Sequence, residues 1–508
     1  MHLVELEQLV LAIALIVIAG VAAVRVSSRS GMPGLLLFLG IGLLLGESGI
    51  GITFDNAGLT HDVGIVLLAL LLIDGGYTTR WDSIKPVISR SALLATVGVL
   101  VSVVVAGGIA YLALPIDPRT AVLLAAMVSS TDAAAVFSIL RRLPIKQRVR
   151  TTLEAESGFN DPPAIVLVAV VVSDAWSQGS VVGMIGSGLY QLAIGALVGL
   201  VIGRIGQFVL QRISLPSSGL YPLATVAIGL LAFSLTGMID GSGLLAAYVA
   251  AVWLGNATLP HHATTASFTE SLGWLTQIVL FVMLGLLASP SELPGAVVPA
   301  IIIGSALTFV ARPLSVLVCL SPFKVGIREQ VFISWAGLRG AVPIVLATIP
   351  LTVGYPDARH IFHVTFLLVV TFTLIQGPLL PRVATWMRVT EVLQPYELNF
   401  DSAPLEGVKA SVVQFEVPTA SKLIGLHVDE LRLPHGAVLS MIIRDDEVLV
   451  PVGQMRLRPG DKLLLAVRSS LIERTQSRLA ALSRDGRLAR WKLSPERWRE
   501  LYGPKDDD

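Results

Sequence analysis

The stretch Glu156–Val172, ESGFNDPPAIVLVAVVV, places a glutamate, a serine, an asparagine and an aspartate within six residues, ahead of two prolines and an apolar run. The run is long enough to lie in a membrane, where a helix needs about 20 predominantly apolar residues to span the hydrocarbon core. A charge near the bilayer centre costs about 2.5–3.5 kcal/mol on insertion scales, so such residues are usually functional. Glu156 and Asp161 therefore mark a candidate site.

The composition identifies an integral membrane protein. Of 508 residues, 54% are hydrophobic and 14% are charged, whereas soluble proteins carry about 25% charged residues. The charges are concentrated at one end, since 34 of the 73 lie after residue 395. We expect a membrane domain at 1–390, a linker at 391–402, a small soluble domain at 403–485 and a charged tail at 486–508.

The net charge of +1 offers no argument for a nucleic-acid partner. Because Cys319 is the lone cysteine, no internal disulfide can form.

Thirteen apolar runs are candidate transmembrane helices. They lie near 6–24, 34–52, 62–78, 92–114, 119–140, 154–173, 183–210, 222–238, 242–256, 271–288, 296–320, 330–350 and 361–385. With the N-terminus outside, almost every basic loop falls inside, as the positive-inside rule requires. Those basic residues are Arg25, Arg29, Arg80, Lys85, Arg90, Arg141, Arg142, Lys146, Arg148, Arg150, Arg204, Arg212, Lys324 and Arg328. Thirteen spans in a cell membrane would place the C-terminal domain in the cytoplasm.

Five charges lie inside these spans: Asp132, Glu156, Asp161, Arg312 and Arg339. A structural ion-pair network is one explanation, but three acids facing at most two bases leave a surplus of negative charge. Close carboxylates cannot all ionise cheaply in a low dielectric. A site that accepts either a cation or protons, but not both, exchanges one for the other.

The two prolines suit cation binding. Pro162 and Pro163 have no amide hydrogen, so within a helix they would free the carbonyl oxygens of Gly158 and Phe159. Glu156, Ser157 and Asp161 add the oxygen atoms that hard cations prefer, and Asn160 is expected to orient them by hydrogen bonding. These runs contain no histidine or cysteine, which argues against zinc or another transition metal. No cofactor is expected.

Two spans are interrupted by polar or glycine-rich residues. If spans one to six and eight to thirteen are two repeats, the fifth and twelfth are equivalent. SSTD (Ser129–Asp132) breaks the fifth, and GLRGAVP (Gly337–Pro343) breaks the twelfth. Paired broken helices point to an inverted-repeat transporter whose site lies near the midplane.

Several segments carry a family resemblance. SSTDAAAVFS, ESGFNDPPAIVL and GLRGAVPIVLA, with GSGLLAAYVAAVWLGN and LLIDGGYTTR, resemble the NhaP-type cation:proton antiporters in their order along residues 1 to about 390. The resemblance implies an all-α, thirteen-helix, inverted-repeat antiporter with two broken crossing helices. It also implies a homodimer in which a core domain moves against a dimerisation domain.

The resemblance also assigns residues. The cation ligands would be Asp161, Glu156, Ser157 and Thr131, with Asp132 as the acid of the broken helix and Arg339 as the partner of a buried carboxylate. The Asn160–Asp161 pair is similar to that of electroneutral members, which implies one proton per cation. Asp74 is either an access-path acid or the hydrated end of a helix.

From Val408 the pattern changes to the period-two alternation of strands, with turns expected at RDDE and LRPGD and a short helix around 420–431. Residues 403–485 resemble the RCK-C (TrkA-C) module. In that family it dimerises and often binds a nucleotide or small ligand that sets transport activity; a purely structural dimerisation role is the alternative. Because this module commonly accompanies potassium transport systems, its presence favours K⁺ over Na⁺ as the substrate, by association alone.

Two other classes of function fit less well. A channel would need a carbonyl filter or a charged ring from repeated subunits, whereas these acids occur once each on different spans. An intramembrane hydrolase would need a base beside Ser157, and no histidine lies in the core segments. We therefore expect a transporter rather than an enzyme, with K⁺ or Na⁺ and H⁺ as substrates.

Overall fold

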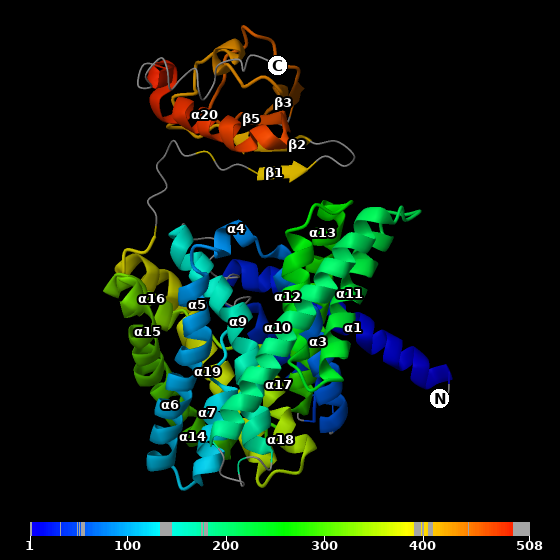
Figure 1. The fold of residues 1–508 in the computed structure, drawn as a ribbon, viewed down its shortest axis with the longest axis vertical. Helices are drawn as coiled ribbons and strands as arrows, with labels where there is room; N and C mark the ends of the chain where they lie inside the picture. The colour runs from blue at the N-terminus through cyan, green and yellow to red at the C-terminus, as the bar shows by residue number, and fades with distance from the viewer. Residues whose placement is uncertain are drawn as a thin grey trace. The chain divides into compact units, whose positions relative to one another are not determined.

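The structure is a computed structural model of the chain. It describes every residue except 1–2, 31, 48, 50, 52–55, 133–144, 174–175, 177–180, 391–397, 399–400, 405–409, 446 and 491–508. The chain divides into two compact units, Met1–Glu391 and Val392–Asp508, which we call the membrane unit and the tail unit (Figure 1).

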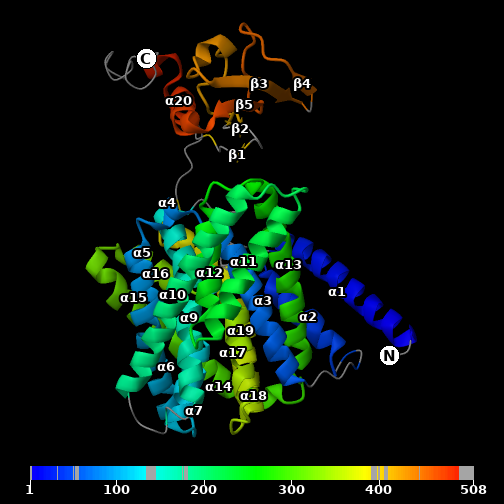
Figure 2. The same ribbon diagram turned by 45° about the vertical axis from the view of Figure 1, so that its right-hand side comes forward.

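The membrane unit is built from helices. They are α1 (Leu3–Ser30), α2 (Gly34–Leu45), α3 (Ala57–Thr78), α4 (Trp81–Ile84), α5 (Ile88–Leu93), α6 (Val99–Ala113), α7 (Pro118–Met127), α9 (Gln147–Val172), α10 (Val181–Arg212), α11 (Leu220–Gly237), α12 (Gly243–Gly255), α13 (His262–Leu287), α14 (Leu293–Ala306), α15 (Arg312–Leu320), α16 (Ile327–Trp335), α17 (Ala341–Leu346), α18 (Thr348–Thr352) and α19 (Ala358–Trp386). Single π-helical turns, η1 (Leu94–Gly98) and η2 (Leu307–Ala311), lead into α6 and α15, and a 3₁₀ turn, η3 (Ser321–Phe323), follows α15. Figure 2 shows α1 at the edge of the unit.

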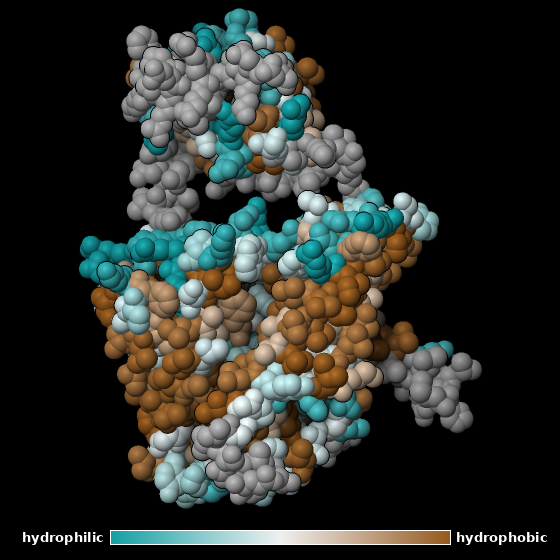
Figure 3. Space-filling view, in the orientation of Figure 1, coloured by the Kyte–Doolittle hydropathy of each residue, from teal (hydrophilic) through white to brown (hydrophobic). Residues whose placement is uncertain are grey.

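The predicted all-α polytopic fold is confirmed. Nine helices in the described part of the chain are long and apolar enough to cross a membrane, and four shorter apolar helices accompany them. The count of thirteen spans stays a prediction. On the face shown in Figure 3, apolar side chains cover the middle of the unit and hydrophilic ones gather at the end that carries α4.

The helices α9 and α13 begin furthest ahead of the positions that their hydropathy indicates. The helix α9 starts at Gln147 rather than near 154, and α13 starts at His262 rather than near 271. Hydropathy marks where the chain becomes apolar, but a helix continues through polar turns that have their own support. In α9 that support includes an ion pair four residues apart, between Arg150 Nε and Glu154 Oε1 at 3.1 Å.

The helix α9 lies at the centre of the membrane unit. It packs against α5, α7, α10 and the π turn η1 (Figure 1). The short helix α17 contacts α9, and it also contacts α7 and α19. The neighbouring α12 lies very close to α3: a Cβ atom on Gly255 would stand 2.1 Å from the carbonyl oxygen of Tyr77. Small residues of this kind let membrane helices approach closely.

The tail unit contains a five-stranded antiparallel sheet with the order β1-β2-β5-β3-β4. Its elements are β1 (Asp401–Pro404), β2 (Ala410–Glu416), η4 (Val428–Leu431), β3 (Ala437–Arg444), β4 (Glu447–Leu449), β5 (Lys462–Arg468), η5 (Ser469–Leu471), α20 (Ile472–Asp485) and η6 (Gly486–Arg490). Its core includes Val413, Phe415 and Leu465 from the strands and Leu479 and Leu482 from α20. The predicted α/β tail fold is confirmed.

In the tail unit, the predicted turns agree with the structure, but the predicted short helix does not. Arg444 pairs with Glu447, so RDDE is the expected hairpin, and Gly460 takes a φ of 82° in the LRPGD turn. The short helix expected around 420–431 is wrong, because only the 3₁₀ turn η4 forms there. Gly425, at a φ of 80°, interrupts the helical path.

Candidate cation and proton site

Two helices of the membrane unit, α7 and α16, end inside it and are followed by irregular backbone. The two irregular segments are bonded to each other. The amide of Asp132 donates to the carbonyl oxygen of Leu338 at 2.9 Å, and Arg339 Nε donates to that of Val128 at 3.1 Å. Irregular backbone is tolerated at membrane depth when it is satisfied by protein in this way. The remainder of the fifth predicted span, 133–140, lies outside the described residues.

The crossing has no room for a side chain at Gly340. A Cβ atom there would lie 1.7 Å from Oδ2 of Asp132. The half-buried carboxylate of Asp132 is therefore seated directly on the backbone of the second broken helix.

The helix α9 brings its polar face to this crossing. It continues through Pro162 and Pro163. Ser157 Oγ donates to the carbonyl oxygen of Thr131 at 2.6 Å, and Asn160 Nδ2 donates to Thr131 Oγ1 at 2.7 Å. These three side chains are buried. Ser157 and Asn160 lie 26 and 29 residues after Thr131 in the chain, and the three form one hydrogen-bonded group.

Asp161 follows Asn160 and is 7% exposed. Its Oδ1 atom is buried without a hydrogen-bond partner among the described residues, and so is Oδ1 of Asn160. A buried carboxylate is costly when it is neither paired nor hydrogen-bonded. A bound proton or a bound cation would remove that cost, so the arrangement can hold either.

Glu156 lies on the same helix but has a permanent partner. Arg312 donates from both terminal nitrogens to Oε1 and Oε2 of Glu156, at 2.5 and 2.8 Å, and both side chains are buried. Glu156 is expected to be a cation ligand, but both its oxygens accept from Arg312, which leaves Asp161 as the buried carboxylate of α9 with an unbonded oxygen among the described residues.

Arg339 also departs from the expectation that it partners a buried carboxylate. It donates to the backbone carbonyls of Val128 and Gly337. A broken helix leaves carbonyl groups without amide partners, and a guanidinium with five N–H donors can satisfy several of them. The role of pairing a buried carboxylate falls to Arg312.

Residues 12–386 match the family described as "Sodium/hydrogen exchanger, transmembrane". The chain belongs to the sodium/hydrogen exchanger family. Residues 412–480 of this exchanger match the TrkA-C domain.

The exchanger has close relatives over most of its length. It is 39% identical over 453 residues to the K(+)/H(+) antiporter NhaP of Alkalimonas amylolytica, covering 87% of this chain and 78% of that protein. It is 34% identical over 468 residues to the K(+)/H(+) antiporter NhaP2 of Shewanella baltica, covering 91% and 81%. The fold is similar to that of the sodium proton antiporter MjNhaP1 of Methanocaldococcus jannaschii, with a TM-score of 0.65 at 23% identity over 74% of this chain and 100% of that one.

Asp74 of the exchanger is packed against a second helix. It sits near the end of α3, where a Cβ atom on Gly273 of α13 would be 2.5 Å from its Oδ2. The carboxylate is thus packed against α13, and an access-path role stays a prediction.

Sequence reasoning missed one side chain at the site, Tyr248 of α12. A Cβ atom on Gly158 would be 2.7 Å from its hydroxyl, and its ring meets that of Phe159 edge-on with centroids 5.9 Å apart. A tyrosine buried in an apolar helix usually has a use for its hydroxyl. That was the available signal, within the quoted segment Gly241–Asn256.

The two π-helical turns were also missed. The turn η2 directly precedes Arg312, and η1 interrupts the fourth predicted span. In the proposed repeat the fourth and eleventh spans are equivalent, so each of the two equivalent spans contains one π turn. Single π turns are often found at functional sites, but no residue pattern distinguishes them from an ordinary α-helix.

Proposed function

We propose that this exchanger moves a monovalent cation, K⁺ in preference to Na⁺, across a cell membrane in exchange for H⁺, with one proton per cation. The cation ligands are Asp161, Ser157 and Thr131, and Asn160 orients them. Asp132 supplies the second acid at the crossing. Arg339 holds the broken backbone, and the Glu156–Arg312 pair fixes α9 against α15.

The observation that carries this proposal is the buried Oδ1 of Asp161, which has no hydrogen-bond donor among the described residues. It lies next to a residue that is bonded into the crossing of two broken helices. Proton and cation would compete for the same carboxylate, so binding of one requires release of the other. Because one carboxylate holds either one proton or one monovalent cation, the arrangement supports exchange without net movement of charge.

The preference for K⁺ is supported by the relatives named K(+)/H(+) antiporters at 39% and 34% identity. The Na(+)/H(+) antiporter 1 of Methanocaldococcus jannaschii is 28% identical over 347 residues. Na⁺ is the alternative substrate.

The remaining parts of the proposal concern the whole chain. The basic loops support an N-terminus outside and a tail unit in the cytoplasm. We further propose a homodimer, and regulation by a nucleotide or other small molecule that binds the TrkA-C-like tail unit.

Purified protein in liposomes containing a pH-sensitive dye tests the exchange. After an imposed proton gradient, K⁺, Na⁺ and Li⁺ are added in turn, and we expect dequenching with K⁺ first. An imposed membrane potential should leave the rate unchanged if one proton is exchanged per cation. A K⁺ conductance without proton counterflow would instead support a channel. The Asp161→Asn protein is the negative control.

A further inference from the structure

The chain leaves the membrane unit through a defined turn after α19. Arg388 takes a left-handed backbone conformation with a φ of 54°, and the amide of Val389 donates back to the carbonyl oxygen of Ala384 at 3.1 Å. This is the six-to-one bond of a Schellman ending. Val389 is fully buried, so the direction in which the chain departs is determined by packing.

The departing segment is bonded to the residues that start α9. Thr390 forms an antiparallel bridge with Ile145, and the amide of Lys146 donates to the carbonyl oxygen of Val389 at 3.1 Å. Lys146 is the residue immediately ahead of α9. The last residues of the membrane unit are therefore attached to the helix that carries Ser157, Asn160 and Asp161.

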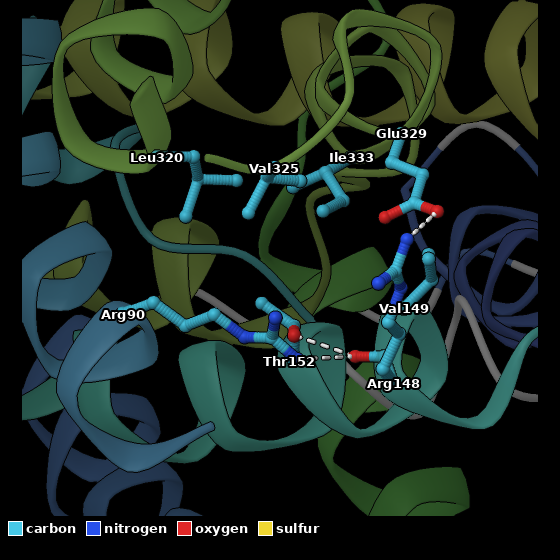
Figure 4. Close-up of a pocket in the computed structure, with 8 residues that line it drawn as sticks. All are labelled: Arg90, Arg148, Val149, Thr152, Leu320, Val325, Glu329 and Ile333. Carbon is cyan, nitrogen blue, oxygen red and sulfur yellow. Dashed lines mark hydrogen bonds and ion pairs between the residues drawn. The ribbon is translucent and has the colours of Figure 1, made fainter. Parts of the chain in front are cut away.

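The same point is linked to the second broken helix. Lys146 Nζ lies 3.3 Å from Oε1 of Glu329 in the first turn of α16, and Arg148 of α9 donates to the same oxygen at 2.5 Å. Glu329 is only 5% exposed. Figure 4 shows Glu329 and Arg148 bonded to each other beside a pocket that both line. Arg90 of α5 lines the same pocket and donates to the carbonyl oxygen of Arg148 at 3.1 Å.

We propose that this junction, formed by Ile145, Lys146, Glu329, Val389 and Thr390, is where the tail unit acts on the cation site. The inference rests on the proposed exchange. The helix α9 is continuous over 26 residues, so a displacement at its start is carried rigidly to Asp161. The helix α16 carries the same displacement to the crossing at Leu338. A pull on the chain after Thr390 reaches both halves of the site without passing through α19.

A matched pair of variants isolates the backbone bond. Lys146 has a φ of −47°, close to the value that proline requires. Lys146→Pro removes the amide that donates to Val389, and it favours the extended conformation of Ile145 that the bridge uses. Lys146→Gln removes the ammonium but keeps the amide. Each is made in the full-length protein with and without Asp461→Ala, which removes the buried partner of Arg444 in the tail unit.

The readout is the rate of K⁺-driven proton exchange in liposomes. In proteins with Lys146 or with Lys146→Gln, we expect Asp461→Ala to change the exchange rate about 5-fold or more. A factor of about 5 is the lower end of the usual coupling between two sites. In proteins with Lys146→Pro, Asp461→Ala should not change the exchange rate. An equal change in the proline and glutamine backgrounds overturns the inference, and so does a wild-type protein that is insensitive to Asp461→Ala. Absence of exchange in every protein, wild type included, would instead overturn the proposed function.

A covalent rescue gives a second measurement. Facing residues of an antiparallel pair have Cα atoms about 4.5–5.5 Å apart, within the span of a disulfide. Ile145→Cys with Thr390→Cys, added to Lys146→Pro, should restore the effect of Asp461→Ala on oxidation and lose it on reduction. If Lys146→Pro does not fold, hydrogen exchange at the Lys146 amide decides: it should lose protection in Asp461→Ala, and unchanged protection contradicts the junction.

Discussion

The role proposed for Asp161 depends on a single oxygen atom. Its Oδ1 is buried without a hydrogen-bond donor among the described residues, while the neighbouring Asn160 is bonded to Thr131. Replacing the carboxylate by an amide of the same shape keeps the packing but removes the charge that a cation or proton would neutralise. We expect Asp161→Asn to abolish exchange in liposomes while leaving insertion and thermal stability unchanged.

The matched control for that prediction is Glu154→Gln. Glu154 lies on the same helix, is partly exposed, and pairs with Arg150 in the turn before it. It should exchange at the wild-type rate. Wild-type exchange by Asp161→Asn would show that the site is assigned to the wrong acid.

Arg312 and Glu156 support a prediction about stability. Removing one partner of a buried ion pair typically costs about 3–5 kcal/mol, because the other charge is left unpaired. Arg312→Met should therefore lower the unfolding temperature in detergent sharply. Arg312→Met combined with Glu156→Leu should recover much of the loss, since an apolar pair of similar volume replaces the ion pair. A double variant no more stable than Arg312→Met would contradict this.

At the scale of elements, the proposed exchange depends on the crossing of two broken helices. Gly340 permits it, because a Cβ atom there would collide with the carboxylate of Asp132. We expect Gly340→Ala to displace Asp132 and reduce the exchange rate by roughly tenfold or more, as small displacements at a reacting site can cost a factor of about 100. Gly108→Ala in α6 is the control, since nothing lies within 4 Å of its added methyl group. Full activity of Gly340→Ala would show that the position of Asp132 is unimportant.

The elements themselves differ in how far they could be predicted. Ser129–Asp132 and Gly337–Pro343 interrupt apolar runs, and that polarity sufficed to predict both breaks. The π turn before Arg312 has no such marker, because it differs from an α-helix only in its hydrogen-bond pattern. The early start of α9 at Gln147 depends on ion pairs and on the bridge to Thr390, which hydropathy does not report.

For the whole molecule, two units imply two separable stabilities. In the tail unit, Asp461 is fully buried and accepts from Arg444 Nε at 2.7 Å, Arg444 Nη2 at 2.8 Å and the amide of Arg458 at 2.7 Å. We expect Asp461→Ala to destabilise the tail unit by about 3–5 kcal/mol and to expose it to limited proteolysis. Fragments of the membrane unit should stay intact. Equal loss of both units would contradict separate folding.

The tail unit should also weaken in acid. Hydrogen bonds from Arg487 and from the His427 amide hold the pKa of Glu430 below its ordinary value. A lowered carboxyl pKa stabilises the fold above the unfolded value of about 4.3, and the contribution is lost as pH falls through the lower folded pKa. Thermal unfolding of the tail between about pH 6 and pH 3 should show this loss. Glu430→Gln should flatten the dependence; an unchanged pH profile would contradict the assignment.

The sequence by itself determined the class of protein, the all-α membrane fold with a small α/β tail, and the segments that matter. Those conclusions follow from composition, from hydropathy and from polar residues placed where burial is expensive, all of which are local properties of the chain. It also indicated that more acids than bases lie in the spans.

Only the tertiary structure decided which charges meet. Glu156 and Arg312 are 156 residues apart, and no local pattern could show that this pair removes Glu156 from the candidate ligands or that Arg339 serves the backbone instead. Pairing between distant residues depends on how helices pack in three dimensions. For the same reason the bond between Lys146 and Val389, and with it the link from the tail to the site, could not be foreseen.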